Sequence, residues 1–315
     1  MVQYIAKVDG KLKVIDQPVK DCWVSITPPF STQELEAEAL KFDIPIDFLI
    51  DSVDIDERSR YEVEDDVKLI VINTPILNDN NSEVESIYVT VPIGIILTNN
   101  NVITITAQEN PIINMFLANK VKNCDPAKKR LLVLQIFDKS VVRYLTCLKK
   151  LNLKRNIIER ELYNSSRNKD LRHLLSIEKS LVYFVNSLSS NELLKLKMKR
   201  TDFLKIKDDE DKMDFYEDII IDNSQALEMA NVYTNILSGT MEAYASIISN
   251  NLNVFIQQLT LITILLMVPT LVASFYGMNV PVPFQHSPNA FWYIIGLSFL
   301  FSMIPAWILF KKKLF

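Results

Sequence analysis

The sequence predicts an α/β domain followed by long helices and a C-terminal hairpin of two membrane-spanning helices. The first observation behind this prediction is an uneven distribution of charge. Asp, Glu, Lys and Arg make up 23% of the 315 residues, yet none of them occurs at positions 243–310. The second is a change of pattern, from short β-branched segments near the start to helical spacing of apolar residues later in the chain.

Two largely apolar segments lie in the uncharged region. They cover positions 254–275 and 291–310 and have 22 and 20 residues. A helix needs about 20 apolar residues to cross the hydrocarbon core of a bilayer, so each segment is long enough to span it. A buried helical hairpin in a globular core would not require 68 consecutive uncharged residues.

The ends of the second segment predict its orientation. Trp292 and Tyr293 at one end and Trp307 near the other are typical of membrane interfaces. Lysines at 311–313 follow directly, and an excess of Lys and Arg marks the cytoplasmic side. We therefore expect a multi-pass protein of the cell membrane, with two spans and both termini in the cytoplasm. We expect no signal peptide, because the first residues lack a basic segment followed by an apolar one.

The first apolar segment carries a polar stripe. Seven positions that alternate by steps of three and four fall within an arc of about 100° on one helix face. These positions are Asn253, Ile256, Thr260, Thr263, Met267, Thr270 and Ser274. The stripe can line a pore shared by several copies, or it can tighten contacts between helices. Since two helices cannot enclose a pore, transport would require an oligomer. The second segment has Ser298 and Ser302 as its main polar residues and is predicted to lie outside, facing lipid.

The part before the membrane is predicted to be α/β and then helical. Strands are expected near 68–73, 86–91 and 101–106, and a helix at 32–49 with Ser31 or Thr32 as its cap. No proline interrupts the chain from 211 to 268, so a helix of about 65 residues should continue into the first span. The predicted domains are a cytoplasmic α/β domain at 1–125, a cytoplasmic helical part at 126–210, the long helix at 211–275, the external loop at 276–290, the second span at 291–310 and a basic tail at 311–315.

Several classes of protein are disfavoured. The three cysteines are far apart and there are two histidines, so neither a zinc cluster nor a disulfide framework is expected. The part before residue 243 has 31 basic and 38 acidic residues, without a basic stripe, which argues against nucleic-acid binding. A membrane-anchored enzyme or scaffold is the alternative from a different class. It is disfavoured because no nucleophile and base are recognisable and because a tether needs no polar stripe.

The turn after the first span resembles that of a known family. Tyr276-Gly277-Met278-Asn279, placed between two C-terminal spans and ahead of a lysine-rich tail, resembles the CorA family of magnesium channels. Further segments that resemble the family are Trp23 to Pro28, the acidic segment at 56–66, and residues 238–253 of the long helix just before the first span. The resemblance implies a homopentamer in which Gly277, Met278 and Asn279 form the external ion-selectivity ring. It also implies pore-lining roles for Asn253, Ile256, Leu259, Thr263, Met267 and Thr270. The helical spacing alone selects Thr260 where the resemblance selects Leu259.

The resemblance also implies that Mg²⁺ is both the transported and the regulatory ion. Asp218 aligns with a position of the family that binds regulatory Mg²⁺ between subunits, with Asp65 or Asp66 as the expected partner. Mg²⁺ gives up its waters reluctantly, which suits a ring of amide and carbonyl oxygens. One departure is that the external loop after Asn279 has no acidic residue. The predicted function is therefore Mg²⁺ influx, with passage of Co²⁺ or Ni²⁺ as well. The alternative is a related transporter for zinc or another divalent metal.

Overall fold

The computed structural model of the chain describes residues 1–78, 85–164, 168–284 and 286–311. The chain divides into two compact units, Met1–Thr240 and Met241–Phe315. One helix, α6 (Glu210–Tyr276), contributes residues to both units. The units are described separately below.

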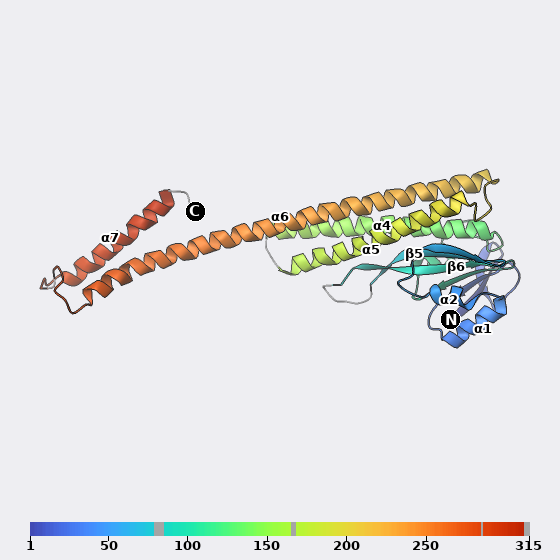
Figure 1. Cartoon of the computed structure of the whole chain (residues 1–315), viewed down its shortest axis with the longest axis horizontal. Coiled ribbons are helices and arrows are strands. Elements are labelled where there is room, and N and C mark those ends of the chain that lie inside the picture. Colours follow the sequence, from blue (N-terminus) through green and yellow to red (C-terminus); the bar gives the residue numbers. More distant parts are fainter. Residues whose placement is uncertain (79–84, 165–167, 285, 312–315) are drawn as a thin grey trace. The chain divides into compact units, whose positions relative to one another are not determined.

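The first unit contains a mixed seven-stranded sheet (Figure 1). Its strand order is β2-β1-β3-β7-β6-β5-β4, and every neighbouring pair is antiparallel except β3 and β7. The strands are β1 (Val2–Val8), β2 (Lys11–Ile15), β3 (Trp23–Ile26), β4 (Arg60–Glu64), β5 (Val67–Leu77), β6 (Tyr88–Leu97) and β7 (Val102–Thr106). The strands predicted near 68–73, 86–91 and 101–106 correspond to β5, β6 and β7. The first four strands were not predicted.

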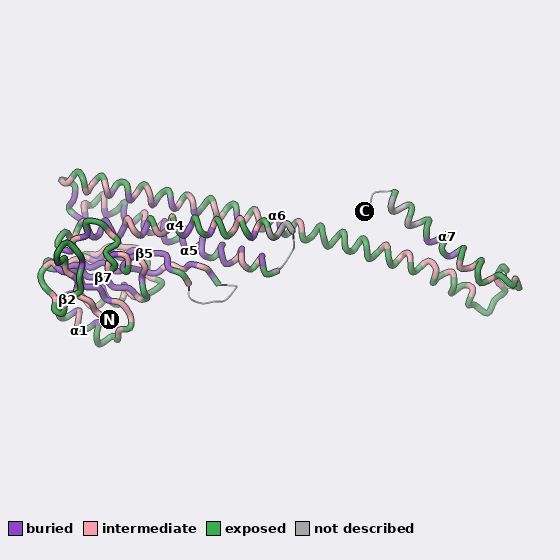
Figure 2. The backbone as a smooth tube through the Cα atoms, turned by 180° about the vertical axis from the view of Figure 1, so that it is seen from behind, coloured by how far each residue is buried: buried purple, intermediate pink, exposed green. Residues whose placement is uncertain are grey.

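The two faces of the sheet pack against different helices. Successive side chains of a strand point to opposite faces. Val24 belongs to a cluster with Leu35 of α1 (Thr32–Phe42) and Phe48 of α2 (Ile46–Asp51). Its neighbour Trp23 stacks edge-on against Phe116 of α3 (Pro111–Leu117), with ring centroids 5.9 Å apart. The sheet therefore has a buried apolar layer on each side, visible as the buried strands in Figure 2.

The helix predicted at 32–49 is two helices. Ser31 caps α1 in a capping box with Glu34, which resolves the choice between Ser31 and Thr32. The chain then turns at Asp43, which has a left-handed conformation, and Pro45 precedes α2. Proline disfavours a helical conformation in the residue before it, so the break has a local cause.

Three long helices complete the chain before the C-terminal turn. They are α4 (Lys129–Asn164), α5 (Asn168–Arg200) and α6, and α4 and α5 cover one end of the β5–β6 hairpin (Figure 1). The long helix predicted at 211–275 is observed as α6, which has 67 residues and contains Pro269. The second unit ends with α7 (Ala290–Lys311), of 22 residues.

Candidate ion pathway and regulatory site

The C-terminal half of α6 is apolar and exposed. From residue 245 to 276 no side chain is buried within the chain, as Figure 2 shows by colour. Among the described residues, α6 is the one helix long and apolar enough to cross a membrane, and a shorter apolar helix covers Ala290–Ile304. An apolar helix with so little of its surface buried needs lipid or other protein around it. The described part of α7 lacks an exposed polar stripe, because Ser298 and Ser302 are buried and donate to carbonyls of their own helix.

The three threonine hydroxyl groups of the polar stripe each donate their proton to a carbonyl of the same helix. Thr263 Oγ1 donates to the carbonyl of Leu259, and Thr270 Oγ1 donates to that of Leu266, each at 2.8 Å. Thr260 Oγ1 does the same toward Ile256 at 2.8 Å. Each hydroxyl oxygen can then only accept hydrogen bonds from outside the helix. A row of outward acceptors is suited to water molecules that surround a cation, since such waters present their hydrogens.

The six pore-lining positions predicted from the resemblance are all exposed on α6. They are Asn253, Ile256, Leu259, Thr263, Met267 and Thr270. Leu259 lies just outside one margin of the stripe and Thr260 lies inside it, and the two side chains point about 100° apart around the helix. A single chain provides one wall of such a pathway, and the roles of these residues stay predictions.

The predicted selectivity residues follow the last turn of α6. The Gly277 amide donates to the carbonyls of Ala273 at 2.9 Å and Ser274 at 3.2 Å, and the Met278 amide donates to Phe275 at 3.3 Å. Gly277, Met278 and Asn279 are all exposed. A Cβ built on Gly277 would make only ordinary contacts, 3.4 Å or more from the nearest atoms. The fold of one chain therefore does not itself require glycine at this position. The absence of a side chain leaves the backbone of Gly277 accessible.

The predicted regulatory carboxylates lie on separate elements of the first unit. Asp218 is exposed on α6, while Asp65 and Asp66 form the turn between β4 and β5. Asp65 has a φ of 50°, and Asp66 accepts a hydrogen bond from Asn99 Nδ2 at 3.3 Å. Within the described part of one chain, no group of three or more His, Cys, Asp or Glu residues could hold a metal. Carboxylates suit Mg²⁺, but a site made from these residues would need a second copy.

The acidic cluster at 208–211 has a structural role. Asp209 Oδ1 accepts a hydrogen bond from the Lys212 amide at 3.1 Å, as a helix cap does. Lys212 also bonds to this carboxylate through its side chain and lowers the pKa of Asp209. These contacts explain the cluster as the start of α6.

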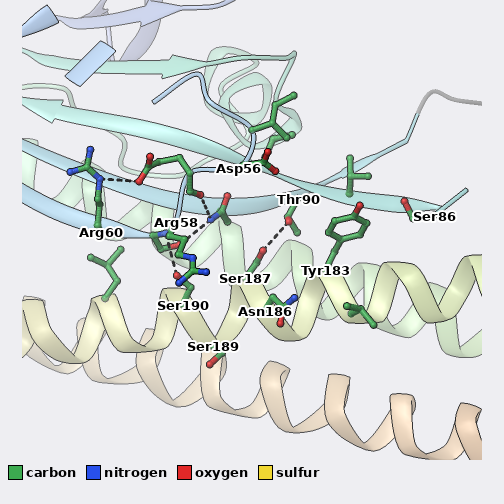
Figure 3. Close-up of a pocket in the computed structure, with 18 of the residues that line it drawn as sticks. Asp56, Arg58, Arg60, Ser86, Thr90, Tyr183, Asn186, Ser187, Ser189 and Ser190 are labelled. Carbon is green, nitrogen blue, oxygen red and sulfur yellow. Dashed lines mark hydrogen bonds and ion pairs between the residues drawn. The ribbon is translucent and has the colours of Figure 1, made fainter. Parts of the chain in front are cut away.

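A groove of about 1780 Å³ lies between α5 and the strands β4, β5 and β6 (Figure 3). Its walls are joined by polar contacts, such as Ser187 Oγ to Thr90 Oγ1 at 2.8 Å and the Ser59 amide to Ser190 Oγ at 3.2 Å. The groove is lined by as many acidic as basic side chains. They are Asp56, Glu57, Glu85, Glu178, Arg58, Arg60, Lys179 and Lys197. Sequence reasoning missed this groove because its two walls are more than 80 residues apart.

A helix that is exposed, apolar and long enough to cross a bilayer is typical of a membrane protein. The chain belongs to the family described as CorA-like Mg²⁺ transporter protein, whose family model matches residues 21–313. This family consists of transporters or channels rather than enzymes.

Two curated relatives match most of the chain. The cobalt/magnesium transport protein CorA of Methanocaldococcus jannaschii is 25% identical over 291 residues, which is 91% of this chain and 89% of that protein. The protein of the same name from Thermotoga maritima is 22% identical over 300 residues, 92% of this chain and 82% of that protein.

Solved structures show the same fold. The complete structure of the CorA magnesium transporter from Methanocaldococcus jannaschii has a TM-score of 0.79 at 24% identity, covering 98% of this chain and 96% of that one. The structure of the full-length CmaX protein has a TM-score of 0.69 at 16% identity, covering 99% and 97%.

Proposed function

We propose that this protein is a divalent-cation channel of the cell membrane that admits Mg²⁺, and also Co²⁺, as a homopentamer. In this assembly the copies of α6 line the pore and the copies of α7 form a second, outer ring of spans. Both termini lie in the cytoplasm. Gly277, Met278 and Asn279 form the ion-selectivity ring at the outer mouth. The observation that carries the proposal is the family match over residues 21–313, which includes α6 and this turn.

The pore would run along the polar stripe. From the outer end inward, its lining positions are Thr270, Met267, Thr263, Leu259, Ile256 and Asn253. The committed hydroxyl protons of Thr263 and Thr270 support this assignment, because their oxygens can only accept hydrogen bonds. Met267, Leu259 and Ile256 would form an apolar constriction between the polar positions, where the pore can close by losing water.

The selectivity ring would bind the ion with its water shell. Mg²⁺ prefers octahedral coordination by oxygen and keeps several of its waters. The amide of Asn279 and the carbonyl of Gly277 present oxygens to these waters without removing them. Their neutral character favours conduction, since an ion must also leave the site. The external loop adds no acidic residue to hold the ion more tightly.

Cysteine modification tests the pore assignment directly. In proteoliposomes that take up Mg²⁺ through the full chain, Thr270→Cys should lose most of its flux after treatment with a cationic, water-soluble thiol reagent. The reason is that a bulky cation would then occupy the proposed lining of the pore. Val272→Cys is the matched control, because it lies about 3 Å further along α6 and about 160° around it. Its flux should be unchanged by the reagent.

The native cysteines give this experiment a low background. Cys22, Cys124 and Cys147 are all free and buried. Burial raises the pKa of the Cys124 thiol to about 11 and raises that of Cys147, which keeps them in the unreactive thiol form. Equal block of both variants, or of neither, would contradict the assignment of α6 as the pore wall.

Regulatory Mg²⁺ would bind between neighbouring copies, with Asp218 of one and Asp65 or Asp66 of the other as ligands. All three carboxylates are exposed in one chain, which leaves them available to a neighbour. A bound ion would relieve their mutual repulsion and favour the closed assembly. A fall in internal Mg²⁺ would then release the pore.

Substitution of Asp218 tests this regulatory site. At Mg²⁺ about 100-fold above its Kd, a bound ion stabilises the folded assembly by about 2.7 kcal/mol, so Mg²⁺ should raise the thermal midpoint of the parent protein. Asp218→Asn should lose most of that rise, whereas Glu228→Gln, at another exposed acid of α6, should keep it. An undiminished effect of Mg²⁺ on Asp218→Asn would exclude Asp218 as a ligand.

A further inference from the structure

A lysine is buried where the three long helices of the first unit meet. Lys195 of α5 is 1% exposed. Its Nζ donates a hydrogen bond to Asn223 Oδ1 of α6 at 2.7 Å. The same Nζ lies 5.7 Å from the ring centroid of Phe137 on α4, within the range of a cation–π contact. The amine thus contacts all three helices.

The residues around Lys195 are those that join α5 to α6. Tyr216 of α6 donates from its hydroxyl to the backbone carbonyl of Lys195 at 2.8 Å. Asn223 Nδ2 donates to the carbonyl of Leu188 at 3.1 Å. Tyr216 and Asn223 are buried like the lysine, with 1% and 0% of their surface exposed. Lys195 is therefore part of the contact through which α6 packs on α5.

The charged form of Lys195 is poorly supported in this setting. An ammonium group has three donors, and the described contacts supply a neutral amide oxygen and a ring face rather than a carboxylate. Burial without an opposite charge disfavours the protonated amine. This burial lowers the pKa of Lys195 to about 7, and the more distant Glu192 only partly opposes the shift.

The other ionisable groups near Lys195 are already engaged. Glu192, on α5, accepts a hydrogen bond from Ser224 of α6. Tyr216, the titratable group of α6 at this contact, has its pKa raised by burial and stays neutral. On α4, the neighbours of Phe137 are Asp138 and Lys139, which pair with each other at 2.7 Å.

We propose that Lys195 is a proton-binding site that links the packing of α6 on α5 to pH. Separation of the two helices exposes the amine to water, where it takes up one proton. Above about pH 7 the packed arrangement keeps the amine neutral and hydrogen-bonded to Asn223. Acidification therefore favours separation.

The sign and the pH window follow from the two pKa values. The pKa of Lys195 is about 7 when the helices are packed, against an ordinary 10.5 when it is exposed. Between these values the separated state binds a proton that the packed state does not. The equilibrium constant for separation therefore falls by about tenfold for each unit that pH rises. Below about pH 7 both states are protonated and the dependence disappears.

This site would act on the ion pathway through α6 itself, which continues from Asn223 to the proposed pore-lining positions. That consequence rests on the proposed function, whereas the proton site does not. A cytoplasm that acidifies toward pH 7 would release α6 from α5 more often.

Hydrogen exchange of the full chain in detergent tests the site without any measurement of transport. The separation constant is obtained from the protection of α5 and α6 amides around Leu188 and Asn223, which exchange when the separated helices unwind, between about pH 6 and about pH 9. The parent protein should show a constant value up to about pH 7 and a fall of about tenfold per unit above it. Lys195→Met should remove this slope while filling the same space. Lys199→Met is the matched control and should keep the slope, because Lys199 joins the same two helices through an exposed pair with Glu217 at 2.5 Å.

A second variant tests the same proton site if Lys195→Met does not fold. Asn223→Asp places a carboxylate beside the amine, which stabilises the ammonium and raises its pKa. The onset of the slope should then move upward by at least about one pH unit. A slope that persists in Lys195→Met, or an onset that is unchanged in Asn223→Asp, would overturn the proposal. The flux of the parent protein has no bearing on either outcome.

Discussion

Asn279→Ala is expected to reduce Mg²⁺ uptake into proteoliposomes by at least about a hundredfold at sub-saturating Mg²⁺. In the proposed pentamer this single change removes five amide oxygens from the ring that receives the hydrated ion. One hydrogen bond contributes about 1 kcal/mol, so five together account for about 5 kcal/mol at the outer mouth. Since each 1.4 kcal/mol is a factor of ten in affinity, the loss of these hydrogen bonds is large enough to weaken ion binding by at least about a hundredfold.

Ser287→Ala provides the control for this result. Ser287 is a polar residue of the same loop before α7, and the proposal gives it no role in ion binding. Its variant should transport Mg²⁺ at the rate of the parent protein. Unchanged uptake in Asn279→Ala would contradict the assignment of the selectivity ring. A reconstituted protein that contains only monomers would contradict the proposed pore.

Gly94→Ala is expected to destabilise the first unit by about 3 kcal/mol, at the upper end of the 1–3 kcal/mol that overpacking of a close-packed core typically costs. Gly94 lies on β6 between Val71 and Ile105. A Cβ at this position would lie 2.1 Å from Ser52 Oγ, 2.3 Å from Ser52 Cβ and 2.9 Å from Ile105 Cγ2. Ser52 is fully buried, and its hydroxyl donates to the Phe48 carbonyl at 2.6 Å, so it cannot move aside without losing that bond.

Thermal unfolding of the full chain measures this effect. A loss of 3 kcal/mol corresponds to a fall of roughly 6–12 °C in the Tm of a unit of this size. Gly239→Ala is the matched control, because a Cβ there meets no atom within 4 Å. It should be neutral or stabilise α6 by up to about 1 kcal/mol. The double variant Gly94→Ala with Ser52→Gly should recover part of the loss, and an unchanged Tm in Gly94→Ala would contradict the close approach of α2 to β6.

Features set by local composition could be predicted before the structure was known. The uncharged segment at 243–310 identified the apolar part of α6, because burial in a hydrocarbon layer excludes charge along the whole length of a helix. The absence of proline between 211 and 268 predicted that the helix continues into that part. The turn at Gly277, Met278 and Asn279 indicated the family, which the match over residues 21–313 confirmed. The role of these three residues stays a prediction.

The sheet was predicted only in part. Strands β5, β6 and β7 are long or strongly β-branched and were recognised, whereas β1 to β4 were not. Their pairing, with β3 parallel to β7 and antiparallel to β1, depends on contacts between distant parts of the chain. A propensity rule that considers neighbouring residues cannot contain this information. The division of 32–49 into two helices was not predicted, although its local cause, Pro45, is present in the sequence.

The burial of Lys195 could not be predicted from the amino-acid sequence. In the segment from Asn191 to Arg200 it is one of several lysines on a helix, and each could equally be a solvated surface charge. Only the packing of α4 and α6 around α5 excludes water from this lysine and leaves Lys197 and Lys199 in contact with solvent. The sequence determined the membrane segment, the continuous helix and the family, because composition and spacing along the chain suffice for each. The tertiary structure decided the sheet order and the burial of Lys195, because both depend on which distant residues remove a group from water.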